Sequence, residues 1–433
     1  MKTQPFFSKF AMVAGFCSFL LLQGCIKDSC DMTIQYREYT PVYLTQAEFL
    51  ETVGVEAPRE MAEPGKIYVK DDFLFVNELG RGVHIFDNKN PQSPQAIAFL
   101  NVPGASEVAF TCDQLIVDAS TDLMVFDLTT PSQPVLASHL PNVLPQRLIF
   151  NGYTADPSKG RIISWESRIR EGNYECNQEI PTIWEMNAVD PQTAAEEGNN
   201  TRTMAPASIG KGGSLSRFAL LGDKMYVVST TELSTYRLSD CGVSHKIGTE
   251  NLFFGIGEAE MVSTMNDILM IGGTEGVAFF GTESDHPEFL STFQHMQACD
   301  PVVGADGIAY VTLRDGEGSP CGNNFTNQLD VLSLENPRNP VLMRSFDMTN
   351  PHGLGIEGNT LFIADGRDGV KVFDATNPFE VGDKLLKVLP GMKAVDVIPF
   401  NGILYTVGES GVSMYDYSDL DNISLLSEIP AVR

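Results

Sequence analysis

The sequence predicts an all-β fold made of repeated units, and three observations support this prediction. Short segments that are apolar, or that alternate between apolar and polar residues, recur from about residue 66 to the end. Gly, Asp, Asn and Pro separate these segments, and these residues end strands and form turns. The segments return with a period of about 40 residues, which gives four strands per unit. Such units are typical of β-propeller blades, so we predict a single propeller over residues 65–433.

The second strand of each unit shows the repeat most clearly. It reads FLFVNE, LIVDAS, MYVVST, ILMIGG, IAYVTL, LFIADG and ILYTVG, beginning near residues 73, 115, 225, 268, 308, 361 and 403. The interval between Leu115 and Met225 leaves room for one longer unit, with RLIF (147–150), RIISWE (161–166) and TIWEMN (182–187) as its strands. We therefore expect about eight four-stranded blades, with seven as the alternative.

A second phrase marks the end of the third strand in several units. It reads GVHIFDNKNPQSP (82–94), LMVFDLTTPSQP (123–134), LDVLSLENPRNP (329–340) and GVKVFDATNP (369–378). Proline cannot donate to a strand ladder, and its φ is already set for a turn. The phrase therefore ends the third strand and fixes the turn to the fourth.

Two of these units resemble a known repeat family. LFIADGRDGVKVFDATNP (361–378) and ILYTVGESGVSMYDYSD (403–419) are similar to the LVIVD repeats of bacterial surface and secreted proteins. The resemblance runs from about residue 66 to the end and implies a propeller, but no reaction, because repeats rather than chemistry define that family. A WD40 propeller fits less well, since neither Trp165 nor Trp184 ends a third strand in a WD dipeptide.

The first 25 residues predict export and lipid anchoring. Lys2 and Lys9 are followed by the apolar segment 10–22, which is too short for a membrane helix but typical of a signal peptide. The segment ends in LQGC, which resembles the lipobox of bacterial lipoproteins. We expect residues 1–24 to be the signal peptide and Cys25 to carry acyl chains such as palmitate, each buried methylene contributing about 0.8 kcal/mol.

Between the anchor and the propeller we expect a tether over residues 25–40 and a short helical lead-in over residues 41–64. Thr45 and Glu48 have the spacing of a capping box, and Gly54 would stop the helix. CIKDSCD (25–31) resembles the acidic export signals of surface lipoproteins. The expected location is the bacterial outer membrane, with the propeller on the cell surface or, alternatively, facing the periplasm.

The charge excludes one class of partner. The chain has 56 Asp and Glu against 29 Lys and Arg, a net charge of −27, which repels nucleic acid. No HExxH, GxSxG, P-loop or GxGxxG motif is present, and the six histidines have no metal-ligand spacing. We therefore expect no cofactor and no metal, and a membrane contact through the lipid alone.

Three functions remain open at this stage. The first is a binding or interaction module whose ligand is a protein, a glycan or a small molecule. The second is an enzyme, a hydrolase or lyase with its active site at the channel mouth. The third is a structural subunit of an outer-membrane complex that uses the rim or blade edges. Two insertions, 167–181 and 314–328, follow second strands and would lie on one face, where repeat proteins often bind.

Charged residues recur where the innermost strands begin. Counting back from the second strands, the candidates for a ligand-binding channel mouth are Lys66, Glu107, Arg147, Arg217, Glu260, Asp300, His352 and Lys393. One interpretation is a ring of ion pairs that satisfy one another. The other is a polar pocket for a small ligand or for a protruding part of a partner.

Disulfides are the expected state of the other cysteines, because an exported chain enters an oxidising compartment. Cys299 precedes the first strand of its unit, and Cys321 lies in the inserted loop of the same unit. We expect a bond between these two residues. The partners of four further cysteines stay open: Cys30, Cys112, Cys176 and Cys241.

Overall fold

The computed structural model describes residues 31–144, 146, 148–175, 180–183, 187, 216–239, 242–295, 301–314, 327–366, 368–390 and 393–432. The chain forms two compact units. One comprises residues 1–38 and 169–198, and the other comprises residues 39–168 and 199–433. The larger unit contains the propeller.

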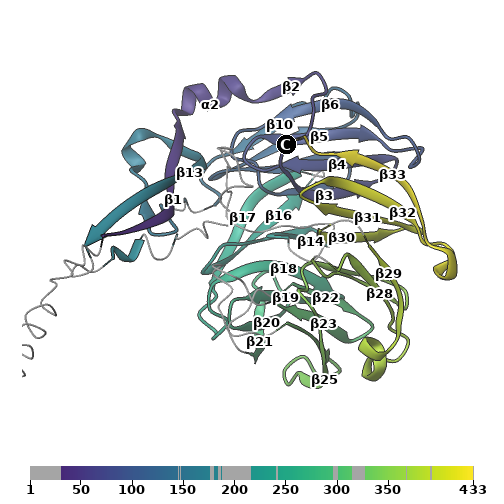
Figure 1. The fold of residues 1–433 in the computed structure, drawn as a ribbon. Coiled ribbons are helices and arrows are strands. Elements are labelled where there is room, and N and C mark those ends of the chain that lie inside the picture. Colours follow the sequence, from purple (N-terminus) through teal and green to yellow (C-terminus); the bar gives the residue numbers. More distant parts are fainter. Residues whose placement is uncertain are drawn as a thin grey trace, which may run out of the picture. The chain divides into compact units, whose positions relative to one another are not determined.

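Seven antiparallel sheets form the blades in the described part of the larger unit (Figure 1). Blade 1 has β3 (Pro64–Lys70), β4 (Phe73–Glu78), β5 (Gly82–Asp87) and β6 (Gln95–Asn101). Blade 2 has β7 (Val108–Thr111), β8 (Gln114–Ala119), β9 (Asp122–Asp127) and β10 (Val135–Leu140). Blade 3 has β14 (Phe218–Leu221), β15 (Lys224–Val228), β16 (Glu232–Ser239) and β17 (Gly242–Asn251). Blade 4 has β18 (Ala259–Met265), β19 (Ile268–Gly273), β20 (Gly276–Gly281) and β21 (Glu288–Gln294).

The last three blades have the same order of strands, each with the innermost strand first. Blade 5 has β22 (Val302–Ala305), β23 (Ile308–Leu313), β24 (Gln328–Ser333) and β25 (Val341–Asp347). Blade 6 has β26 (Leu354–Glu357), β27 (Thr360–Ala364), β28 (Val370–Asp374) and β29 (Leu385–Leu389). Blade 7 has β30 (Ala394–Phe400), β31 (Ile403–Gly408), β32 (Gly411–Asp416) and β33 (Ser424–Pro430). Short 3-10 turns interrupt the loops at Pro157–Lys159, Pro378–Asp383 (η2) and Leu420–Asn422.

The turn between the first and second strands has the same backbone conformation in every blade. Its first residue has a φ of 47–59°, and the residues at this position are Asp71, Cys112, Gly222, Asn266, Asp306, Gly358 and Asn401. Asp, Asn and Gly tolerate this left-handed conformation better than other residues. The carbonyl of the second turn residue accepts a hydrogen bond of 2.7–3.0 Å from an amide at the end of the third strand or directly after it, as with Asp72 and Asn88. This bond ties the hairpins of one blade together.

The repeated phrase after the third strand has a defined physical role. In four blades the terminal Asp side chain accepts a hydrogen bond of 2.7–3.0 Å from the amide two residues later, at Asp87, Asp127, Asp374 and Asp416. Such a turn redirects the chain without a partner from elsewhere. The phrase therefore ends one strand and starts the next within each blade.

The hydrophobic core lies between the blades. Seven clusters of buried side chains each join two successive blades, and the cluster that contains Ile67 and Tyr405 joins blade 7 to blade 1. A parallel bridge between Met61 and Ala431 lies at the same boundary, where the amide of Val432 donates to the carbonyl of Met61 at 2.7 Å. The two ends of the propeller sequence therefore close the ring.

The expectation of eight blades is wrong, and the alternative of seven is correct. Residues 148–166 form instead the hairpin of β11 (Ile149–Phe150) and β12 (Tyr153–Thr154) and the start of β13 (Arg161–Glu175), which pairs with β1 (Asp31–Leu44). Its buried side chains pack among themselves, as Phe150 does on Trp165. Of residues 182–187, the structure describes 182, 183 and 187, and none of these is in a strand.

No additional blade fits between blades 2 and 3, because the two share a cluster directly. Ile116 and Val125 of blade 2 pack with Phe218 and Met225 of blade 3. The segment 141–217 is thus an insertion between two adjacent blades. Apolar periodicity predicts that a segment is a strand, but only its partner decides to which sheet it belongs.

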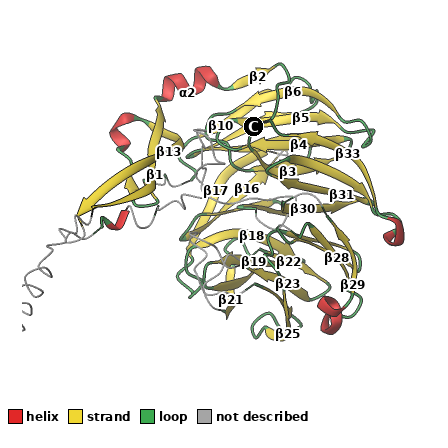
Figure 2. Cartoon of the chain, viewed as in Figure 1, coloured by secondary structure: helices red, strands yellow, loops and turns green. Residues whose placement is uncertain are grey.

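The lead-in forms the short helix α2 (Gln46–Thr52), with the capping box between Thr45 and Glu48 (Figure 2). β2 (Gly54–Glu56) then pairs with the outer strand β6 and covers the edge of blade 1. Residues 31–40, which were expected in the tether, lie in β1, and residues 25–30 lie outside the described residues. None of the described helices has the length and apolar composition needed to cross a membrane.

Candidate functional site

Three of the predicted channel-mouth residues occupy equivalent positions at the starts of neighbouring inner strands. Lys66 lies in β3, Glu107 precedes β7, and Arg217 precedes β14. In each of these blades, the fourth residue of the second strand pairs with a residue of the first strand. The charged residue comes directly before that paired residue. The repeat therefore brings these three side chains to the same level of blades 1, 2 and 3.

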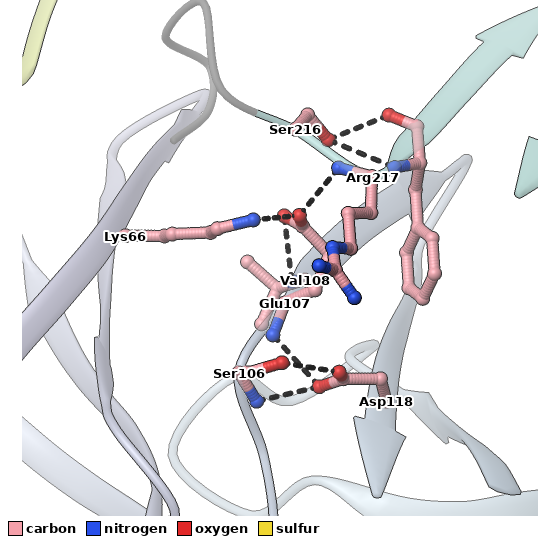
Figure 3. A network of polar contacts seen from close by, with 8 residues as sticks. Lys66, Ser106, Glu107, Val108, Asp118, Ser216 and Arg217 are labelled. Atoms are coloured by element: carbon pink, nitrogen blue, oxygen red, sulfur yellow. Dashed lines mark hydrogen bonds and ion pairs between the residues drawn. The ribbon is translucent and has the colours of Figure 1, made fainter. Parts of the chain in front are cut away.

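Glu107 connects the three blades through its carboxylate (Figure 3). Oε2 accepts hydrogen bonds from Lys66 Nζ and, at 2.8 Å, from the backbone amide of Arg217. Lys66 is 0% exposed and the Glu107 side chain 1% exposed. We call Lys66, Glu107, Asp118 and Arg217 the inner network.

Asp118, at the end of β8, supports Glu107 from below and was not among the predicted residues. Its Oδ1 accepts the backbone amides of Ser106 at 2.6 Å and of Glu107 at 2.7 Å, and its Oδ2 accepts the Ser106 hydroxyl at 2.5 Å. The segment before β7 is therefore held by a buried carboxylate of its own blade (Figure 3). The sequence offered one indication, since Asp118 is a charged residue inside an apolar strand.

Burial controls the protonation of the inner network. It lowers the pKa of the Lys66 amine and raises the pKa of the Glu107 carboxyl, because water solvates neither charge. The opposite charge of the partner counters each shift. Burial also raises the pKa of Asp118, against the hydrogen bonds from Ser106. These pKa shifts are those of buried groups that neutralise or hydrogen-bond one another inside the protein.

The arrangement supports the ion-pair interpretation for Lys66 and Glu107. A ligand group would have to displace a buried partner, and leaving a buried charge alone costs several kcal/mol. The chemistry that the geometry supports best is mutual neutralisation, which fixes three inner strands to one another.

In the other four blades the equivalent positions are Met261, Pro301, Gly353 and Asp396. The extra residues in β18 and β30, between Ala259 and Met261 and between Ala394 and Asp396, lie before these positions and do not shift them. The sequence count started from the first residue of the second strand in blades 4, 5 and 7, but from the second residue in blades 1, 2 and 3, so it missed three of these positions by one residue. Glu260 lies one residue before its equivalent position, in β18.

Asp396 is a site residue that the sequence count missed. It is fully buried, and its Oδ1 lies 2.1 Å from the place where a Cβ on Gly353 of the neighbouring blade would be. Gly353 therefore has to be glycine for the Asp396 carboxylate to fit. The sequence count missed this position because it started from Ile403, the first residue of β31, rather than from Leu404.

The remaining predicted residues do not join the inner network in the described structure. His352 Nε2 lies 2.6 Å from Asn350 Oδ1, and burial, with Arg314, lowers its pKa to about 3. Lys393 is exposed. Five predicted residues lie outside the described residues: Cys25, Arg147, Asp300, Cys299 and Cys321. Of the two insertions, the structure describes 167–175, 180, 181, 314, 327 and 328.

Two open pockets lie at blade boundaries, at the ends where first-to-second strand turns occur. One, of about 470 Å³, lies between blades 7 and 1 and is lined by Asn90, Pro91, Gln92, Asn401, Gly402, Ile403, Asp416, Ser418 and Leu426. The other, of about 400 Å³, lies between blades 1 and 2 and includes Lys70, Phe73 and Asp113. Neither includes a predicted channel-mouth residue. Among the described residues, no group of three or more His, Cys, Asp or Glu side chains could hold a metal ion.

A run of exposed apolar side chains marks the outer edge of blades 5 and 6. These residues are 40–53% exposed: Val341 and Leu342 of β25, Phe379 of η2, and Leu385, Leu386 and Val388 of β29. Arg344 of β25 donates to the carbonyl of Phe379 at 2.7 Å, so the two blade edges adjoin. We call these six residues the rim patch. The sequence did not reveal it, because fourth strands read like core strands.

The comparisons with known proteins are limited to the fold. No family model matches the chain, and no curated protein matches it in sequence. The solved structure of the computationally designed Ika8 protein has a TM-score of 0.48 at 10% identity, covering 87% of this chain and 91% of that chain. The structure of Saccharomyces cerevisiae Sqt1 has a TM-score of 0.48 at 12% identity, covering 88% of this chain and 100% of that chain. The structure of BamB from Moraxella catarrhalis has a TM-score of 0.45 at 8% identity, covering 87% of this chain and 97% of that chain. The propeller assignment rests on the seven sheets and the closed ring of clusters.

Proposed function

We propose that the chain is an exported, lipid-anchored β-propeller that binds a protein partner through the rim of blades 5 and 6. The rim patch is the observation that carries this proposal. Large exposed groups of apolar side chains on a protein surface often mark protein interaction sites. The resemblance of the repeats to the LVIVD family supports a bacterial surface protein.

The composition of the rim favours a protein over a glycan or a small anion. Its charged residues are paired with one another, with Arg344 at 2.7 Å from Asp383 and Lys384 at 3.5 Å from Glu380. Paired charges around exposed apolar residues resemble the polar rim and apolar centre of a protein interface. The inner network, by contrast, offers a ligand only groups that already have partners.

The anchor is supported by the LQGC sequence at Cys25 and by one structural observation. Cys112 is disulfide-bonded, and stable disulfides are typical of exported proteins. An exported chain with a lipobox would be acylated at Cys25, and a Cys25→Ser variant should lose labelling by a fatty-acid analogue. Labelling that persists in this variant would disprove the anchor.

The rim proposal is tested by two matched pairs of substitutions in the full-length protein. Phe379→Ser with Leu386→Ser changes the rim patch, whereas Val135→Ser with Leu136→Ser changes an equally exposed pair (64% and 44%) at the start of β10. Exposed sites of this kind change stability little, so both should melt close to the wild type. In envelope extracts of the source bacterium run on a native gel, the wild type and the β10 variant should migrate as a high-mass complex. The rim variant alone should no longer migrate with that complex. Unchanged migration of both variants would refute the rim as the contact.

The position relative to the membrane has a separate test. Protease added to intact cells should degrade an outward-facing propeller and spare a periplasmic protein used as a control. If the propeller survives until the outer membrane is opened, the proposed surface location is wrong, whatever the rim binds.

A further inference from the structure

Cys112 occupies a position that cysteine rarely takes. It is the first residue of the two-residue turn between β7 and β8, which is closed by the pair Thr111 and Gln114. Its φ is 47°, and the other blades have Asp, Asn or Gly at this position. Left-handed backbone is uncommon for other residues, so this cysteine needs a reason. Its disulfide bond supplies one.

The ends of β16 and β17 lie close to this turn, and another cysteine lies between them in the sequence. Ser239 and Gly242 pair at these ends, and only residues 240 and 241 separate them in the chain. A Cβ on Gly242 would lie 3.3 Å from Oε1 of Gln114, the residue that closes the Cys112 turn. Gly242 and Gln114 are thus neighbours. Cys112 lies two residues before Gln114 and Cys241 directly before Gly242 in the sequence, so a disulfide, which needs Cα atoms about 4.4–6.8 Å apart, can join these two cysteines.

The register of β1 and β13 brings the sequence neighbours of two further cysteines opposite each other. In the smaller unit, Thr33 Oγ1 donates to Asn173 Oδ1 at 2.7 Å, and Gln35 Nε2 donates to Glu171 Oε1 at 3.1 Å. Each step along β1 is therefore one step back along β13. Asp31, the first residue of β1, then opposes Glu175, the last of β13, and in the sequence Cys30 directly precedes Asp31 and Cys176 directly follows Glu175. Directly opposed residues have Cα atoms about 4.5–5.5 Å apart, within disulfide range.

We infer that Cys112 is bonded to Cys241 and Cys30 to Cys176. Of the other four cysteines, Cys17 lies in the expected signal peptide and Cys25 is left for the lipid, so Cys299 and Cys321 remain as the pair that the sequence predicts. Each bond joins two sulfur atoms as two thiols release two protons and two electrons. The oxidant is an oxidised dithiol protein of the export compartment, whose disulfide is reduced in the exchange.

Both inferred bonds involve the insertion 141–217, because Cys112 and Cys241 lie on either side of it in the chain and Cys176 lies within it. Blades 2 and 3 are separated by these residues in the chain, so no short connection holds them together as it does other successive blades. A bond between Cys112 and Cys241 joins the two blades at their hairpin tips. A bond between Cys30 and Cys176 joins the outer ends of β1 and β13.

Trypsin separates all of these cysteines, which makes the test direct. Cys112 falls in peptide 90–147, Cys241 in 238–246, Cys30 in 28–37, Cys176 in 171–202, Cys299 in 247–314 and Cys321 in 315–338. The full-length protein, exported and alkylated without reduction, is digested and mapped by mass spectrometry. We expect 90–147 linked to 238–246 and 28–37 linked to 171–202. Linkage of 90–147 to any other peptide, or an alkylated Cys241, would overturn the first pairing, and an alkylated Cys30 the second.

Single substitutions provide an independent measurement. Cys241→Ser should expose one thiol to maleimide without reductant, and the label should be found in peptide 90–147. Cys299→Ser is the matched control and should place no label in that peptide. If the Cys241→Ser label appears elsewhere, the pairing is wrong. The wild-type map decides the question even if a variant folds poorly.

Discussion

Replacing Lys66 by Met distinguishes a structural inner network from a ligand site. The substitution removes the ammonium group from a fully buried site and leaves the Glu107 carboxylate, 1% exposed, with backbone donors only. Breaking a buried ion pair at one side costs about 3–5 kcal/mol. The propeller region spans about 370 residues (64–432), and at about 2.1 cal/mol/K per residue this cost lowers Tm by about 4–6 °C.

The loss should depend on pH in a defined direction. Burial already raises the pKa of Glu107 in the folded protein, and removal of Lys66 raises it further. A folded pKa above the unfolded value means that protonation favours folding, so the penalty is absent below the unfolded pKa and grows as pH rises towards the folded pKa. The Lys66→Met variant should therefore be closer to wild type at pH 5 than at pH 8.

A double-mutant cycle with Glu107→Gln provides the control. The glutamine side chain introduced by that substitution is neutral and can still accept the amide of Arg217, so Lys66→Met with Glu107→Gln should melt above Lys66→Met alone. Thermal unfolding followed by circular dichroism at pH 5 and pH 8 measures all four proteins. The reasoning fails if Lys66→Met stays within about 1 °C of wild type at pH 8. A variant more stable than wild type would indicate a ligand site held at a cost in stability.

Three other substitutions test further contacts. Burial acts to raise the pKa of Glu78, but hydrogen bonds from His84 and Arg59 hold it at about 2. The free energy of unfolding of the wild type should therefore fall by about 2 kcal/mol, a figure discounted because Arg59 is partly exposed, as pH falls from about 4.5 to 2. Glu78→Gln should lack this loss in urea titrations, and equal pH profiles of the two proteins would contradict it. Gly353→Ala should lower Tm by several degrees, because its Cβ would meet Asp396, and an unchanged Tm would remove that role. Phe49→Ala removes a fully buried ring from α2 at a cost of about 3–5 kcal/mol, so trypsin should cut after Arg59 sooner, and wild-type cleavage rates would show that Phe49 does not hold the lead-in.

The sequence could predict the strands because their signals are local. All seven second-strand segments begin within one residue of β4, β8, β15, β19, β23, β27 and β31. The turn at Asp71 and the bend after Asp87 depend on hydrogen bonds within a few residues, and every blade repeats them. A fixed offset also placed Lys66, Glu107 and Arg217 at equivalent positions, because a short turn joins the first two strands of each blade.

Other features depend on residues that are distant in the sequence. RIISWE has the pattern of a blade strand, yet its partner is β1, more than 100 residues earlier. Strand pairing also decides which residues of different blades are equivalent, so a count that started one residue too early selected Glu260 and passed over Asp396. Whether a charge is neutralised or open to a ligand depends on burial, which no single repeat contains.

The sequence by itself determined the class of fold, the strands and turns of each blade, and the positions at which charges recur. The tertiary structure alone decided that there are seven blades, that Lys66 and Glu107 neutralise each other, and that the rim of blades 5 and 6 is apolar and exposed. The reason is physical. Turn conformation and strand alternation are settled by neighbouring residues, whereas burial and pairing are settled when blades distant in the chain meet and exclude water from the space between them.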